Sequence, residues 1–292
     1  MSAGVAVVTG ATSGIGRETV RVLAADGLRV LGVGRSAERC REAERELRRW
    51  SGNAEVEILV ADLSSLEEVR RLAAEILGRT QAVDVLVNNA GLFTLSRTVT
   101  VDGIETQLAV NWLAAFALTG LLLEPLRRAG SARVVNISSG SHYAGRMHWD
   151  DLGLCRGYRG LKAYDQSKLA MVLFTAELAR RLHGPDAPAA FAVDPGLVKT
   201  DIGSKGTNAL ARLVWKLRKG RGISAGEAAQ SVAWCALDPL AARRSGCYWK
   251  ERRVEIPSAL ARDPVSARRL WEMGERMSGV RYPLVSLHAA HP

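Results

Sequence analysis

The chain has 292 residues, of which 47% are hydrophobic and 24% are charged, so its composition excludes a mainly disordered protein and suits one large domain or two small ones. The net charge of +10 comes mostly from arginines that alternate with acidic residues along helical segments, as in 38–49, and no nucleic-acid-binding motif accompanies them. We therefore expect a basic surface and no nucleic-acid partner.

Apolar strand-like runs alternate with helix-period segments from the start of the chain. Strands are expected at 4–9, 28–33, 55–61, 83–88, 132–138 and 189–193, and helices at 14–26, 37–50, 65–79, 102–129, 163–183 and 225–237. This order predicts a doubly wound, Rossmann-like, mostly parallel sheet in a three-layer α/β/α single domain over 1–292. The apolar stretch 108–123 is too short for a transmembrane helix and contains Asn111, so it is interpreted as a buried helix.

A glycine-rich turn follows the first strand, with the sequence TGATSGIG at 9–16. A pyrophosphate group needs unpaired backbone N–H groups, the positive end of a helix dipole and no side chain in its way. Gly10, Gly14 and Gly16 meet these needs at a strand–turn–helix junction. The turn therefore predicts a dinucleotide site.

The same turn resembles that of the short-chain dehydrogenase/reductase family, and further motifs at strand ends extend the resemblance along nearly the whole chain. These motifs are Asp62-Leu63, Asn88-Asn89-Ala90-Gly91, Asn111, Asn136-Ile137-Ser138-Ser139 and Pro195-Gly196 followed by Thr200. Within the family the chain looks most like the retinol-dehydrogenase-like branch, although Asp194 stands where that branch usually has histidine. By resemblance, the cofactor-binding residues are Gly10, Ser13, Gly14, Ile15, Gly16, Asp62, Leu63, Asn89, Ala90, Gly91, Tyr164, Lys168, Pro195, Gly196, Val198 and Thr200.

Tyr-x-x-x-Lys occurs twice, at Tyr158/Lys162 and at Tyr164/Lys168. The first pair encloses Gly160 and precedes the helical pattern, whereas the second begins it, and i,i+4 residues of a helix share one face. We therefore predict that Tyr164 and Lys168 are the catalytic pair. A neighbouring ammonium favours the phenolate, so we expect it to lower the tyrosine pKa toward the range useful for proton transfer.

The resemblance implies roles for two more residues. Ser139 would hydrogen-bond the substrate oxygen, with Ser138 as the alternative, and Asn111 would hold a water in a proton relay. The alternative for Asn111 is a polar residue that is merely satisfied inside a helix.

The cofactor is predicted to be NADP(H). No acidic residue lies between Gly27 and Ala37, where an NAD-binding fold places one, and Arg35 is available there for the 2′-phosphate, with Arg17 or Arg39 as helpers. The simpler alternative is that Arg35 is a solvated residue at a helix entry.

These residues predict an oxidoreductase that interconverts a carbonyl and an alcohol on a hydrophobic small molecule (retinoid-, steroid- or polyketide-like). Reduction is the expected direction, because NADP(H) is the expected cofactor. By resemblance, the walls of the pocket would include Leu92, Phe93, His142, Tyr143 and the 201–223 segment, and no metal site is expected. Two alternatives are a cofactor-binding sensor or scaffold and a non-redox enzyme on the same fold.

The segment 201–223 is expected to form a substrate lid, since apolar and basic residues alternate at helical spacing within it. The same pattern would suit weak contact with an anionic membrane surface. By resemblance, helices 102–129 and 163–183 would pair subunits in a homodimer or homotetramer, unless the sheet uses their apolar faces. Four scattered cysteines and a first strand that begins at Gly4, with no signal peptide before it, predict a cytoplasmic protein.

Overall fold

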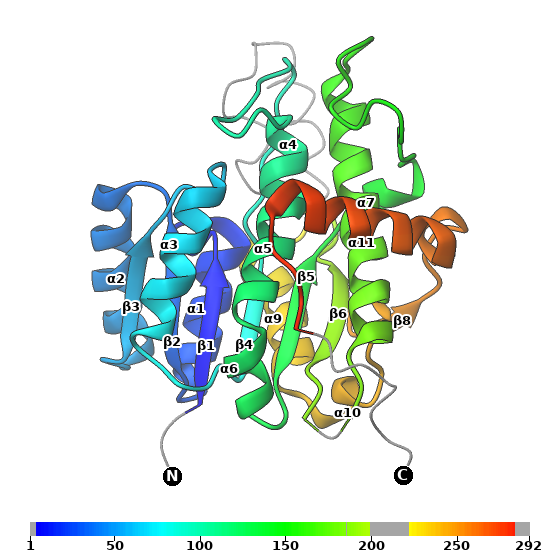
Figure 1. Cartoon of the computed structure of the whole chain (residues 1–292). Helices are drawn as coiled ribbons and strands as arrows, with labels where there is room; N and C mark the ends of the chain where they lie inside the picture. The colour runs from blue at the N-terminus through cyan, green and yellow to red at the C-terminus, as the bar shows by residue number, and fades with distance from the viewer. Residues whose placement is uncertain (1–3, 185, 199–221, 284–292) are drawn as a thin grey trace.

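A computed structural model describes residues 4–184, 186–198 and 222–283 of the chain. The described strands form one sheet in the order β3-β2-β1-β4-β5-β6-β7-β8, in which only β7 and β8 pair antiparallel (Figure 1). The six predicted strands are confirmed, as β1 (Val5–Thr9), β2 (Arg29–Gly34), β3 (Val56–Val60), β4 (Val85–Asn88), β5 (Arg133–Ile137) and β6 (Ala189–Asp194). The predicted doubly wound fold is therefore confirmed.

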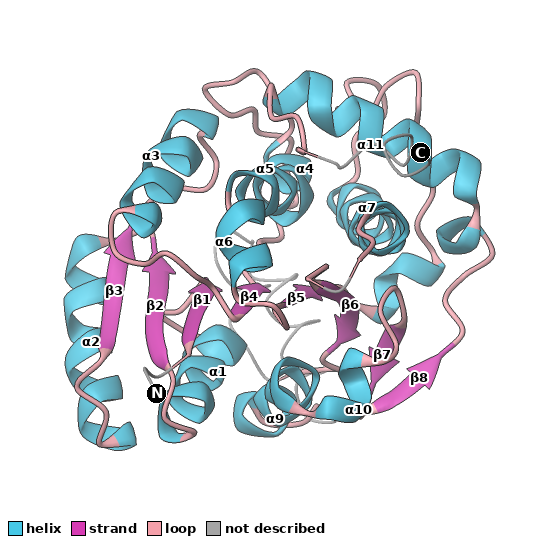
Figure 2. Ribbon diagram, turned by 60° about the horizontal axis from the view of Figure 1, so that its bottom comes forward, coloured by secondary structure: helices cyan, strands magenta, loops and turns pink. Residues whose placement is uncertain are grey.

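Helices cover both faces of the sheet (Figure 2). One face carries α1 (Gly14–Ala25), α2 (Ala37–Ser51) and α9 (Ala225–Leu237), and the other carries α3 (Leu66–Leu77), α5 (Ala114–Leu121) and α7 (Gly160–Arg181). Strands buried on both faces have nearly continuous apolar sequences, which is why the pattern alone located them. None of the described helices combines the length and the apolar character needed to cross a bilayer.

The predicted helix 102–129 is interrupted. It consists of α4 (Thr106–Leu108), a π-helical stretch (Ala109–Leu113), α5 and α6 (Leu123–Arg128). Pro125 accounts for the last break, because a proline ring clashes with the carbonyl four residues earlier, here that of Leu121, where α5 ends. The π-helical stretch carries Asn111 and turns its side chain toward the loop after β4.

The elements after α9 were not predicted from the sequence. These are α10 (Pro239–Ala242), β7 (Tyr248–Lys250), β8 (Arg253–Glu255) and α11 (Pro264–Ser278). The turn between β7 and β8 holds Glu251 and Arg252 at positive φ angles of 49° and 62°, a conformation that usually selects glycine or asparagine. Because those residues are absent, the hairpin has no sequence signature.

α11 lies across α5 and α7 (Figure 1). The Trp271 ring of α11 is 5.3 Å from Phe116 on α5 and 6.1 Å from Phe174 on α7, and the Tyr282 hydroxyl donates to the Phe116 carbonyl at 2.6 Å. The helix surface that was expected to pair subunits is thus covered, and it is α11 of the same chain that covers it together with the sheet.

Candidate active site

The site lies at the carboxyl edge of the parallel strands, where the first residues after β1, β2, β4, β5 and β6 come together. All predicted site residues are described except Thr200, which lies outside the described residues together with most of the expected lid at 201–223. Pro195, Gly196 and Val198 follow β6, and Val198 forms a bridge with Ile223.

The turn after β1 has the shape that a pyrophosphate needs. Gly10 has a φ of +71°, and a Cβ at Gly16 would collide with the Gly10 carbonyl and the Asn89 amide. Ser13 caps α1 with its backbone alone, although α2, α3, α9 and α11 each begin with a serine or aspartate side chain that accepts a backbone N–H. The first turn of α1 also contains no acidic residue. Its N–H groups and dipole are therefore open to an anion, and the residues fit a dinucleotide.

Thr9 joins this turn to the loop after β4, a role that its sequence pattern did not indicate. Its hydroxyl accepts from the backbone N–H groups of Asn89 and Ala90 at 3.0 Å each, and the Asn89 side chain donates back to the Thr9 carbonyl at 2.8 Å. The motif string contained Thr9, but only the pairing of β1 with β4 shows what its hydroxyl contacts.

Arg35 is exposed directly after β2. A Cβ on Gly34 would collide with the Thr12 side chain, so β2 ends against the phosphate turn. Arg17 points elsewhere: it forms an ion pair with Glu46 and lies 4.5 Å above the Trp50 ring. Arg17 was expected to help bind a 2′-phosphate, but its guanidinium is already paired with Glu46.

The Tyr164/Lys168 pair lies on α7, which begins at Gly160. The Lys168 ammonium is buried, donates to the Ile137 carbonyl at 3.0 Å and lies 5.5 Å from the centre of the Tyr164 ring. Phe93 meets the same ring edge-on at 5.8 Å. Tyr158 is instead held before the helix, where its hydroxyl accepts from Gln107 at 2.8 Å and donates to Glu105 at 3.1 Å.

Burial sets the proton affinity of both catalytic side chains. It raises the pKa of Tyr164 to about 12, against the effect of its hydrogen bond with Ser139, and it lowers the pKa of Lys168 to about 8. The expectation that the ammonium lowers the tyrosine pKa is thus wrong for this structure. The reason is that loss of solvent has the largest effect on the phenol and the charges of Asp194 and Asp165 add to it, while the Lys168 ammonium is directed at the Ile137 carbonyl.

Ser138 and Ser139 face different surroundings. Ser138 is buried and donates to the Lys168 carbonyl at 3.0 Å. Ser139 is partly exposed, accepts from the Ser141 N–H at 3.2 Å, and lies close enough to the Tyr164 phenol to lower the pKa of that group. Only Ser139 can therefore present a hydroxyl beside the phenol.

Asn111 is completely buried, and both of its amide protons are used. Nδ2 donates to the Leu92 carbonyl at 3.0 Å and to the Ser167 hydroxyl at 2.9 Å, while Oδ1 accepts from the Leu92 N–H at 2.7 Å. Oδ1 retains one lone pair. Asn111 therefore fixes the loop after β4 against α7, and its expected role in holding a relay water stays a prediction.

Of the expected wall residues, His142 is fully buried. Its Nδ1 lies 2.9 Å from the Ser139 carbonyl and its Nε2 accepts from the Ser258 N–H at 3.2 Å, so it supports Ser139 from behind as a neutral imidazole. Tyr143 is half exposed, and Leu92 and Phe93 lie beside Asn111 and Tyr164. His142 is therefore a supporting residue, and its assignment to the wall is wrong.

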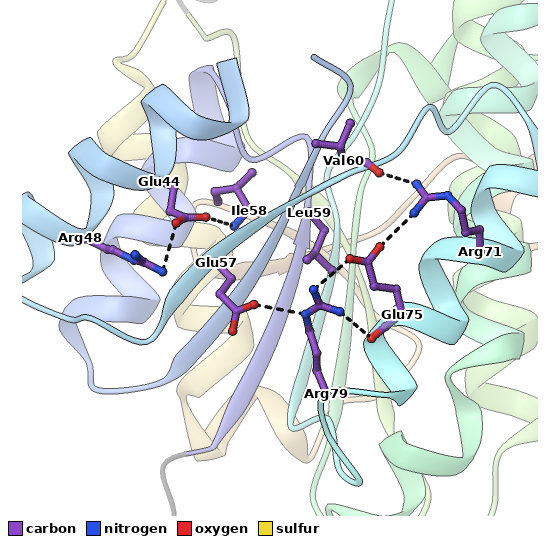
Figure 3. A pocket seen from close by; sticks show the side chains of 9 residues that line it. All are labelled: Glu44, Arg48, Glu57, Ile58, Leu59, Val60, Arg71, Glu75 and Arg79. Atoms are coloured by element: carbon purple, nitrogen blue, oxygen red, sulfur yellow. Dashed lines mark hydrogen bonds and ion pairs between the residues drawn. The ribbon is translucent and has the colours of Figure 1, made fainter. Parts of the chain in front are cut away.

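A cavity of about 470 Å³ lies away from this site, beside the edge strand β3 (Figure 3). Its charged side chains pair with one another, as Glu44 with Arg48 at 3.1 Å and Glu57 with Arg79 at 3.2 Å. Glu44 also accepts from the Ile58 N–H of β3 at 2.8 Å, and Arg48 donates to the Val56 carbonyl at 2.7 Å. These side chains hydrogen-bond backbone N–H and C=O groups at the edge of the sheet. Their charges pair with one another, so none of them is left for a ligand.

Comparisons with known proteins agree with this geometry. The family model for short chain dehydrogenase matches residues 4–210. The chain is 37% identical to human retinol dehydrogenase 13 over 96% of this chain and 86% of that protein, and 38% identical to human retinol dehydrogenase 12 over 95% and 87%. It is 37% identical to mouse polyprenol dehydrogenase over 94% and 84%. A crystal structure of a protein from Mycobacterium paratuberculosis, 32% identical, superimposes with a TM-score of 0.77 over 96% of this chain and 95% of that one.

Proposed function

The chain belongs to the short-chain dehydrogenase family, in its retinol-dehydrogenase-like branch, and from this membership we propose that it is an NADP(H)-dependent reductase of hydrophobic carbonyl compounds. The family supports an oxidoreductase that acts on an alcohol or carbonyl with a nicotinamide cofactor. The observation that carries the proposal is the contact of Ser139 with Tyr164, beside a buried Lys168 and at the same sheet edge as the open N-terminus of α1.

When bound, a nicotinamide supplies the hydride that attacks the carbonyl carbon. Tyr164 donates its phenolic proton to the carbonyl oxygen, which takes the electron pair of the broken C=O π bond and becomes the alcohol oxygen. The Ser139 hydroxyl hydrogen-bonds the same oxygen while negative charge develops on it. Lys168, held by the Ile137 carbonyl, keeps a positive charge close to the phenolate that remains. The reverse sequence oxidises an alcohol.

The direction of the reaction is proposed from the protonation states of Tyr164 and Lys168. With its pKa raised to about 12, Tyr164 holds its proton at neutral pH and is prepared to act as an acid. Lys168, with a pKa of about 8, is mostly charged at neutral pH. Both states favour proton donation to a carbonyl oxygen and so support reduction.

Arg35 supports the choice of NADP(H). It follows β2 at the phosphate turn, it is exposed, and it has no ion-pair partner within the described part of the chain. A guanidinium there would bind a 2′-phosphate through charge-assisted hydrogen bonds. Asp62 accepts from the Ser64 N–H at 2.9 Å through one carboxylate oxygen in the turn after β3, and its contact with the cofactor stays part of the proposal.

The substrate is proposed to be a hydrophobic molecule of retinoid-, steroid- or polyketide-like character. Phe93 packs against the Tyr164 ring, and Leu92 lies in the adjoining loop. Tyr143 is half exposed and its ring contacts His142, the residue that supports Ser139. The names retinol dehydrogenase and polyprenol dehydrogenase of similar proteins point to long apolar alcohols. An apolar wall on these elements suits such a molecule.

A panel of retinal, a polyprenal, a steroid ketone and a small polar ketone, each with NADPH and NADH, tests the proposal through the nicotinamide absorbance. We expect turnover of the apolar carbonyls with NADPH and none in Tyr164→Phe. Binding of NADPH without turnover of any member would favour the sensor or scaffold alternative, and turnover of a substrate with no change in the nicotinamide would favour a non-redox enzyme.

A homodimer or homotetramer remains part of the proposal, but α11 covers the helices that were expected to join subunits. The edge strand β8 offers a different surface, because Val254 is 41% and Ile256 74% exposed, whereas side chains cover the edge of β3.

We also propose a cytoplasmic location, for which four free cysteines give support. Weak membrane contact through 203–222 stays a proposal, because all of this segment except Gly222 lies outside the described residues.

A further inference from the structure

Asp194 ends β6 next to the catalytic residues and is 5% exposed. Its neighbour Val193 pairs with Ile137 of β5, and the Val193 carbonyl accepts from the Ser138 N–H at 2.8 Å. Ile137 is also the residue whose carbonyl holds the Lys168 ammonium. A Cβ on Gly140, the residue after Ser139, would lie 3.4 Å from the Asp194 carboxylate. The carboxylate thus borders the site from the side of β6.

Two neutral donors hold this carboxylate. Oδ1 accepts from the Gly196 N–H at 2.9 Å, and Oδ2 accepts from the Tyr248 hydroxyl at 3.1 Å. Within the described residues, no arginine, lysine or histidine nitrogen lies within the 4.0 Å of an ion pair. Lys250 is the strand partner of Asp194 but forms no such pair with it. A buried carboxylate without a direct counter-ion acts on charges farther away, because little solvent screens it.

The titratable groups around Asp194 come from three sides of the site. α7 contributes Tyr164, Asp165 and Lys168; the 3₁₀ turn Gly140–Tyr143 contributes His142 and Tyr143; and the β7–β8 hairpin contributes Tyr248, Lys250 and Glu255. Burial lowers the pKa of His142, and burial raises the pKa of Tyr248 far above its ordinary value, so neither gives Asp194 a positive partner. Lys168 is the cation of the catalytic pair, and the Asp194 charge raises its pKa against the larger effect of burial.

We propose that Asp194 is a positioning residue that acts through charge, holding the protons on Tyr164 and Lys168 and thereby keeping the site in its proton-donating form. A negative charge favours the protonated state of every neighbouring group, whether that state is a neutral phenol or an ammonium. For Tyr164 this effect adds to burial, and for Lys168 it opposes burial. The proposal rests on the proposed function insofar as it explains a preference for reduction.

Asp194→Asn tests the charge with little change of shape, since the amide oxygen can still accept from the Gly196 N–H. The cofactor-free, full-length protein is labelled at the lysine ε-carbons, the Lys168 signal is assigned by its loss in Lys168→Arg, and its chemical shift is followed against pH by NMR. We expect the titration midpoint of Lys168 to fall by roughly one pH unit from its value of about 8. An unchanged midpoint overturns the proposal, whatever happens to activity.

Tyr248→Phe is the matched control, because it removes the hydroxyl that bonds Asp194 and leaves the charge in place. We expect no downward shift of the Lys168 midpoint in this variant, and an equal shift in both variants would mean that packing rather than charge is responsible.

In the reductive kcat/KM profile, Asp194→Asn should move the alkaline limb to lower pH. A rate that is lower at every pH with an unmoved limb would show a merely structural role. A protein without reductase activity would refute the proposed function but would leave the NMR test valid.

Discussion

The Ser138 hydroxyl donates a hydrogen bond of 3.0 Å to the Lys168 carbonyl, so it fastens the end of β5 to α7 and turns away from the site. Its neighbour Ser139 therefore presents the hydroxyl that meets Tyr164. Successive residues of an extended segment point to opposite sides, which lets one residue hold the catalytic helix while the next faces the substrate.

This division of roles predicts different outcomes for the two serines. Ser139→Ala should lower kcat by about 100-fold or more, since it removes a donor to the developing oxyanion, with little change in stability. Ser138→Ala should lower the free energy of unfolding by about 1 kcal/mol, because it removes the buried hydrogen bond from the hydroxyl to the Lys168 carbonyl, which keeps its bond within α7, and it should reduce kcat less. Chemical denaturation and steady-state kinetics on both variants check this. A larger kcat loss in Ser138→Ala would reverse the assignment.

The two Tyr-x-x-x-Lys pairs are separated by a similar comparison. Tyr164→Phe should abolish turnover and leave cofactor affinity nearly intact, because only the proton donor is lost. Tyr158→Phe should keep turnover close to that of the parent and lose about 1 kcal/mol of stability, since its hydroxyl bonds Gln107 and Glu105. Fluorescence titration of the cofactor accompanies the kinetics. An active Tyr164→Phe with an inactive Tyr158→Phe would identify the other pair.

The pH dependence of reduction should follow Lys168. A pKa lowered to about 8 means that the side chain is charged below that pH and neutral above it. We expect the reductive kcat/KM to fall as the pH rises through about 8, while Tyr164 still holds its proton. Far-ultraviolet circular dichroism at each pH serves as the control for unfolding. A profile that stays flat well above pH 8 would contradict this assignment.

Arg35→Ala should lower the preference for NADPH over NADH by roughly ten- to a hundred-fold, the value of one charge-assisted contact. Arg17→Ala is the matched control, because Arg17 is already paired with Glu46 and stacked on Trp50. We expect the control to leave the preference nearly unchanged. The measurement is kcat/KM with each cofactor, and a parent that prefers NADH would show that no 2′-phosphate is recognised here.

If the protein assembles through β8, Val254→Lys should weaken the assembly, since a lysine on an edge strand discourages pairing with another strand. Light scattering over a range of concentrations should then give a larger mass for the parent than for the variant. Arg253→Lys, which keeps the charge on the same strand, should behave as the parent does. A parent at monomer mass throughout would remove the assembly from the proposal.

The sequence by itself determined the elements that carry strong local signals. Strands β1 to β6 were predictable because burial on both faces makes each of them almost wholly apolar, and the Gly10–Gly16 turn because close backbone approach tolerates no side chain. The sequence also separated Tyr164 and Lys168 from Tyr158 and Lys162, because only the first pair lies wholly within the helical pattern, although α7 begins at Gly160 and not at 163.

Only the tertiary structure decided what depends on contacts distant in sequence. The β7–β8 hairpin turns at Glu251 and Arg252, which carry no turn signal, and α11 covers α5 through packing that no local pattern encodes. The raised pKa of Tyr164 follows from burial, which a residue list does not show. Likewise, the sequence marked Asp194 as a departure from the branch, but the pairing of β6 with β5 and the hydroxyl of Tyr248 decide what its charge faces.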